Sequence, residues 1–123
     1  MTLTPCLFAA VVLAASLAAF AHGDEQARHG GVVQSVRDIS YELASHDLGL
    51  MLYVADHGNP MPTAGMTGTL VLMQGTQRTD VALQPAGENT MLAKGAKLRR
   101  GQRPTAVLAM PSGRSVVIAF PLK

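Results

Sequence analysis

The chain has 123 residues, of which 48% are hydrophobic and 15% are charged, and its formal net charge is +2. This length fits one domain, and the apolar fraction is too high for a disordered chain. Low aromatic content and a small net charge argue against a nucleic-acid binder. A single Cys excludes an internal disulfide framework and a multi-cysteine zinc site.

The first segment has the features of a secretory signal peptide. Residues 6–21 form an uncharged apolar run that is short for a membrane span and ends in the small-x-small pattern Ala19-Phe20-Ala21. We therefore expect residues 1–21 to be a cleaved signal peptide, which predicts a periplasmic protein with no stable membrane insertion. Because the first residues carry no Lys or Arg, a retained N-terminal anchor is the alternative.

The rest of the chain is predicted to be a short polar arm and one β-domain. Residues 22–31 are polar and are expected to form a flexible N-terminal arm, followed by a domain over residues 32–123. Residues 39–43 alternate apolar and polar side chains, as a strand with one buried face does. The further candidate strands are residues 50–54, 68–73, 81–84, 90–94, 105–110 and 115–120.

Turn signals separate these candidates at short intervals, and Pro111-Ser112-Gly113-Arg114 is typical of a hairpin turn. No segment shows a sustained helical period. The pattern predicts an all-β fold, a small immunoglobulin-like β-sandwich of about seven strands.

The mature region carries no recognisable catalytic motif. It has no Cys, no serine in a G-x-S-x-G turn, no phosphate loop and no dinucleotide fingerprint. We therefore do not expect an enzyme, although a copper redox enzyme that uses the N-terminal His22 is a remote third hypothesis.

Metal binding is the remaining chemical signal. The histidines are His22, His29, His46 and His57, and cleavage after Ala21 would give His22 a free α-amine beside its imidazole. Met61 and Met66 flank a Pro/Gly-rich loop close to His57, and thioether sulfur suits Cu(I). The candidate ligands for a transition metal, Cu or Zn, are His22, His29, His57, Met61 and Met66. The alternative is that the histidines are exposed loop residues and the methionines pack in the core.

Charge is unevenly distributed along the chain. Most of the acidic residues precede residue 57, whereas Lys94, Lys97, Arg99, Arg100 and Arg103 cluster within ten residues. This basic stretch is interpreted either as a solvated loop that protects a sheet edge or as a docking patch for an anionic partner.

Several short motifs resemble a known family. His29-Gly30-Gly31 is followed by Tyr41-Glu42-Leu43, then by residues 52–56 with Pro60, and later by residues 85–87 with Leu92. This pattern resembles small exported proteins of Gram-negative bacteria. These are similar to the N-terminal β-domain of periplasmic adaptor proteins from heavy-metal efflux systems of the resistance–nodulation–division type.

The resemblance implies a periplasmic sandwich near Cu, Zn, Co or Cd efflux, with the histidine of the family's HGG element at His29. Many adaptor domains also carry a Glu-Pro-His segment in a late strand, whereas residues 100–105 here contain no His. The hairpin, barrel and lipoyl-like parts of a full adaptor are absent, so this chain resembles one free-standing module.

Two functional hypotheses follow. The first is a periplasmic metal-handling accessory protein that binds or buffers Cu, Zn or Co ions near an efflux system. The second is a metal-free interaction module that docks on a larger envelope complex through a sheet edge or the basic stretch. In both, the expected partner is an efflux or envelope protein.

Overall fold

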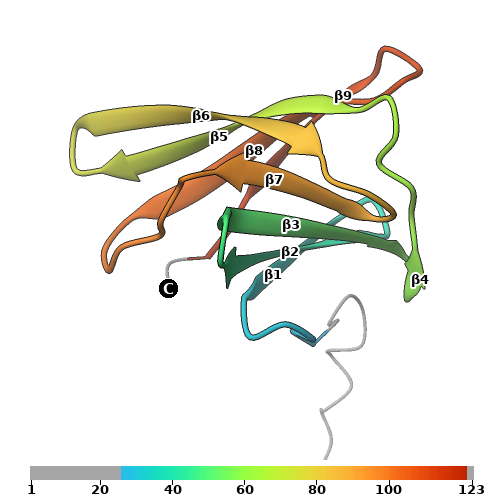
Figure 1. Ribbon diagram of the computed structural model, residues 1–123, viewed down its shortest axis with the longest axis horizontal. Helices are drawn as coiled ribbons and strands as arrows, with labels where there is room; N and C mark the ends of the chain where they lie inside the picture. The colour runs from blue at the N-terminus through green and yellow to red at the C-terminus, as the bar shows by residue number, and fades with distance from the viewer. Residues whose placement is uncertain (1–25, 122–123) are drawn as a thin grey trace, which may run out of the picture.

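The computed structural model describes residues 26–121, and within them every regular element is a β-strand (Figure 1). The predicted all-β fold is therefore confirmed. The predicted signal peptide and His22 lie outside the described residues. Between residues 26 and 121 there is no helix with the length and apolar character needed to cross a membrane. The strands are β1 Val32–Val36, β2 Ile39–His46, β3 Gly49–Asp56, β4 Asn59–Pro60, β5 Thr67–Gln74, β6 Gln77–Pro85, β7 Thr90–Lys94, β8 Arg103–Ala109 and β9 Ser115–Ala119.

The strands form one folded-over sheet in the order β1-β2-β3-β7-β6-β5-β8-β9, with the short β4 paired to β3. Every pairing is antiparallel. β6 pairs with β5 through residues 77–83 and then with β7 at Gln84 and Pro85, so it passes from one layer to the other. The spatial order β8-β5-β6-β7 is a Greek key. Figure 1 shows the resulting two layers, which make a nearly closed sandwich.

The core lies between the layers and is built from alternate residues of each strand. Because side chains on a strand point to opposite faces in turn, one face of each central strand is apolar. The largest fully buried side chains include Tyr41 and Leu43 of β2, Leu50, Leu52 and Val54 of β3, Leu70 of β5, Leu83 of β6, Met91 of β7, Leu108 of β8 and Ile118 of β9. Each such side chain contributes about 1.5–3 kcal/mol to folding.

Two strands were not among the sequence candidates, namely β1 and β4. Each is connected to its partner strand by a two-residue turn with positive φ at both positions, Arg37 (+53°) with Asp38 (+70°) and His57 (+53°) with Gly58 (+85°). These are the dihedrals of a type I′ turn, which matches the twist of a hairpin. The first of these turns contains no Gly and so lacks the usual sequence signal. The predicted hairpin around residues 111–114 is confirmed between β8 and β9.

Candidate functional site

The outer face of β2 carries a buried carboxylate. Tyr41 and Leu43 point into the core, so the neighbouring Ser40 and Glu42 point to the other side of the layer. Glu42 is nevertheless only 6% exposed, because the residues that precede β1 cover it. An ionised group in such a place requires hydrogen-bond donors.

The backbone before β1 supplies those donors. Glu42 Oε1 accepts a hydrogen bond from the Arg28 amide (2.9 Å), and Oε2 accepts from the amides of His29 (2.8 Å) and Gly31 (2.9 Å). His29 Nδ1 lies 3.1 Å from Oε1. Burial alone would raise the pKa of Glu42, but these backbone amides and the His29 side chain together hold the pKa below the ordinary carboxyl value. Residues 28–31, the end of the predicted flexible arm, are thus docked on the sheet.

Each glycine of the His29-Gly30-Gly31 element has its own structural reason. Gly30 adopts a φ of +74°, which residues with a Cβ rarely adopt. Gly31 packs so closely on β2 that a Cβ would lie 2.1 Å from the carbonyl oxygen of Leu43. The two sequence elements that carry the family resemblance, His29-Gly30-Gly31 and Tyr41-Glu42-Leu43, therefore form one structural unit.

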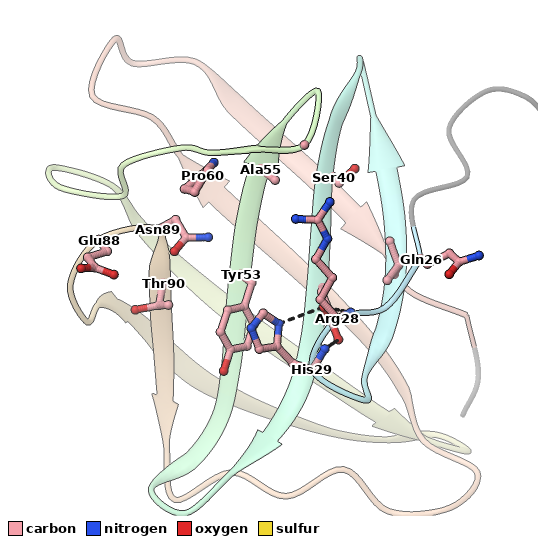
Figure 2. Close-up of a pocket in the computed structure, with 13 residues that line it drawn as sticks. Gln26, Arg28, His29, Ser40, Tyr53, Ala55, Pro60, Glu88, Asn89 and Thr90 are labelled. Atoms are coloured by element: carbon pink, nitrogen blue, oxygen red, sulfur yellow. Dashed lines mark hydrogen bonds and ion pairs between the residues drawn. The ribbon is translucent and has the colours of Figure 1, made fainter.

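The ring of His29 is fixed by two contacts. It stacks on Tyr53 of β3 with centroids 3.6 Å apart and an angle of 3° between the planes (Figure 2). Because an ionised carboxylate only accepts hydrogen bonds, the contact with Glu42 assigns the proton to Nδ1. When the ring is neutral, Nε2 is therefore the nitrogen that carries the lone pair, on a side chain that is 43% exposed. Histidines that bind metal ions almost always donate their other ring N–H to a partner of this kind.

A hollow of about 410 Å³ lies beside this histidine, and it is called the polar hollow because most of the residues that line it have polar or charged side chains. Its charged lining residues are Arg28, Glu42 and Glu88, which give one negative charge in excess when His29 is neutral. Figure 2 shows Glu88, Asn89 and Thr90 on the side of the hollow away from Arg28. The hollow therefore favours a cation over an anion.

The loop between β6 and β7 holds Glu88 in place beside the hollow. Asn89 makes two hydrogen bonds with the backbone of Val54 in β3. Its backbone carbonyl accepts from the Val54 amide (3.0 Å), and its side-chain Nδ2 donates to the Val54 carbonyl (3.1 Å). The buried Thr63 donates its amide to the Glu88 carbonyl (3.0 Å) and its hydroxyl to the Thr90 carbonyl (2.7 Å). Glu88 itself adopts a φ of +46°, which is uncommon for a residue with a side chain.

Within residues 26–121 the structure places His29, His57 and the two methionines at three separate positions. His57 lies in the β3–β4 turn, where its 73% exposed side chain contacts Asp56 at 2.6 Å. Met66 is a core residue with 1% exposure, and Met61 packs against the core. Both methionines line a hollow next to Tyr41, on the opposite face of β2 from His29. Burial in the core, not loop exposure, is thus the observed state of Met66.

Among the predicted ligands that the structure describes, only His29 lies in the polar hollow. No group of three or more His, Cys, Asp or Glu side chains gathers in a metal-binding arrangement within residues 26–121. Sequence reasoning did not include Glu42, Tyr53 and Glu88 in the site. The alternation in residues 39–43 places Glu42 on the face away from Tyr41, but only the docked segment explains why this carboxylate is buried.

The basic stretch runs from the last residue of β7 to the first residue of β8 and forms a separate surface. Its five cationic side chains are exposed, and none makes an ion pair or a side-chain hydrogen bond within the described part of the chain. Lys94, Lys97 and Arg99 line one hollow of about 440 Å³ together with Thr79. This surface is suited to an anionic partner.

Comparisons with known proteins return no match to any family model, curated protein or solved structure. The protein is an all-β sandwich in which the buried carboxylate of Glu42 clamps residues 28–31 onto β2 and orients the ring of His29.

Proposed function

We propose that the protein is a periplasmic metal-handling accessory protein, which binds or buffers Cu, Zn or Co ions near a heavy-metal efflux system. The observation that supports this most directly is the orientation of His29. Glu42 fixes its tautomer, and Tyr53 fixes the plane of its ring, so Nε2 is a preformed nitrogen donor. The resemblance of the His29-Gly30-Gly31 element to adaptor domains points to the same chemistry.

The electrostatics of the hollow favour this class of ligand. Imidazole nitrogen suits Cu(II), Zn(II) and Co(II), and the excess negative charge of the lining attracts a cation. Glu88 lines the same hollow and offers a carboxylate oxygen. A site with few protein ligands binds a metal weakly and releases it readily, which suits buffering and transfer.

His22 is the proposed second nitrogen ligand. It precedes His29 by seven residues in the sequence, and a chain of that length spans up to about 25 Å. If the chain begins at His22, its α-amine and imidazole add two nitrogen donors, the set that Cu(II) prefers in a tetragonal site. The metal would then join the N-terminus to the docked segment.

The test is a titration of the chain that begins at His22 with Cu(II), Zn(II) and Co(II), and with Cu(I) under reducing conditions. The chain has two tyrosines and no Trp. Because the ring of Tyr53 stacks on His29, Cu(II) at this site should quench tyrosine fluorescence. His29→Phe keeps an aromatic ring stacked on Tyr53 but removes both ring nitrogens. The matched control is His57→Asn, which removes an exposed histidine at a turn position whose positive φ Asn tolerates.

We expect His29→Phe to weaken Cu(II) binding at least tenfold and His57→Asn to leave it unchanged. An additional residue before His22 should also weaken Cu(II) binding if the amine is a ligand. Equal affinity of the wild type and His29→Phe for all four ions would contradict the proposal. Affinity no better than that of a peptide lacking these histidines would contradict it as well.

The second candidate function is a metal-free interaction module that docks on an envelope complex. It is supported by the five exposed cations of the basic stretch, which have no ion pair within residues 26–121 and three of which share one hollow. Cross-linking in the periplasm with Arg99→Glu/Arg100→Glu provides the test. Loss of a cross-linked partner would favour docking through this surface, whereas unchanged cross-links would exclude it.

A further inference from the structure

A second hollow opens at one end of the sandwich, on the core side of β2. It has a volume of about 1040 Å³ and lies between the β1–β2 turn, the loop after β4 and the β8–β9 hairpin. This volume slightly exceeds the range of about 300–1,000 Å³ that is usual for small-molecule sites. It shares no lining residue with the polar hollow around His29.

The floor and walls of this hollow are apolar. Tyr41 and Met66 are buried core residues, so an occupant would contact the core itself. The partly buried side chains that form the walls are Val36, Ile39, Met61, Met110 and Val116. Methionine side chains are flexible and polarizable, and they adapt to ligands of irregular shape.

The charged residues of the lining are both cations. Arg37 belongs to the β1–β2 turn and Arg114 to the β8–β9 hairpin, so the two approach from different elements. Neither guanidinium has an ion pair or a hydrogen bond within residues 26–121, and no Asp or Glu lines the hollow. An occupant with a negative group would therefore find two unpaired partners at exposed positions.

The same charges disfavour a metal ion among the three methionine sulfurs. Cu(I) would enter a hollow that already carries two positive charges, with no carboxylate to offset them. An apolar body with an anionic head matches both parts of the lining.

We propose that this hollow binds a single-chain anionic amphiphile, with the alkyl chain against Tyr41 and the methionines and the head group at Arg37 and Arg114. The inference does not depend on metal binding at His29. Free fatty acids and the lysophospholipids of the envelope share this chemistry, and their head groups distinguish them in the test.

The test is displacement of an environment-sensitive dye from the full mature chain, below the micelle concentration of each competitor. The probes are dodecanoate, decanoate, dodecanol, dodecyltrimethylammonium and a lysophosphatidylglycerol. Each methylene that enters the hollow should tighten binding by up to about fourfold. Two ion pairs at exposed positions should make dodecanoate bind about tenfold tighter than dodecanol, and tighter still than the cationic probe.

Two variants locate the binding. Arg37→Asn/Arg114→Gln should reduce dodecanoate affinity to that of dodecanol, and Asn is compatible with the positive φ at position 37. Arg100→Gln removes an exposed cation elsewhere and should change nothing. Met61→Gln should weaken all chains alike, and a thermal melt will show that each variant remains folded.

Several results would overturn the proposal. Dodecyltrimethylammonium should bind more weakly than dodecanoate, so equal affinities would refute the role of the arginines. Unchanged affinity in Met61→Gln would place the amphiphile elsewhere. A dimer that forms with rising protein concentration and excludes dodecanoate would show that a second copy of the chain is the occupant. Preference for the lysophospholipid over dodecanoate would support the proposal and identify a lysophospholipid, not a free fatty acid, as the ligand.

Discussion

Replacing Glu42 by Gln perturbs the clamp that holds the N-terminal segment on β2. The two carboxylate oxygens accept four contacts, three from the amides of Arg28, His29 and Gly31 and one from the His29 ring. A glutamine side chain keeps one acceptor oxygen and turns an NH₂ group toward two of the donors. Two of the four contacts should therefore be lost.

The magnitude follows from these two contacts. A hydrogen bond to a charged group contributes about 1.5–3 kcal/mol net, and part of this is offset because the neutral side chain costs less to bury. We expect Glu42→Gln to lower the free energy of unfolding by about 2–4 kcal/mol. For a domain of about 100 residues, the melting temperature should fall by roughly 10–20 °C.

Urea denaturation gives the global change, and amide hydrogen exchange shows its location. The amides of residues 28, 29 and 31 should lose protection in the variant at urea concentrations where the core strands remain protected. The reasoning would be refuted if these three amides exchanged at the same rate in both proteins. A stability loss without that local change would mean that Glu42 acts through some other contact.

Three further predictions concern the same region. The stability difference between wild type and Glu42→Gln should be constant above about pH 5 and should shrink as pH falls below the unfolded carboxyl pKa of about 4.3. The reason is that the folded state lowers the pKa of Glu42, so it is stabilised only while this carboxyl is ionised. Chemical denaturation at several pH values measures this difference. Gly31→Ala should destabilise by about 2–4 kcal/mol and Gly30→Ala by only about 1–2, since the first meets backbone and the second meets open space; equal melting temperatures would contradict this. Thr63→Val should cost about 0.5–1.5 kcal/mol by removing the hydroxyl's hydrogen bond to the Thr90 carbonyl, which still accepts the Ala86 amide, and Thr63→Ser should restore most of that stability.

The central strands could be predicted from the sequence because their burial leaves a local pattern. Residues 50–54 are buried except for the half-buried Tyr53, residues 39–43 are buried on the core face, and both segments were recognised. β1 was not, because all five of its residues are half-buried and their polarity does not alternate. The turn that follows, Arg37-Asp38, adopts positive φ without the Gly that usually marks such a hairpin.

The candidate site was less predictable because it depends on register. Glu42 reaches the amides of residues 28–31 only because β1 folds back along β2, with Val32 opposite Leu43. The spacing of residues along the sequence does not predict that pairing. The sequence likewise does not show whether Met61 and Met66 are exposed loop residues or core residues. In the structure, the hydrogen bonds of the buried Thr63 fix the loop so that Met66 enters the core.

The strand order also determines how the chain reaches this structure. β3 pairs with β7, so Leu50 meets Ala93, which lies 43 positions further along the chain, and β5 likewise pairs with the distant β8. Forming such distant pairings closes large loops, which costs chain entropy before packing contacts compensate for it. Proteins dominated by such pairings fold in milliseconds to seconds. The β1–β2–β3 meander is local, so it can form first, and the clamp on the N-terminal segment can be complete before the second layer closes over the core.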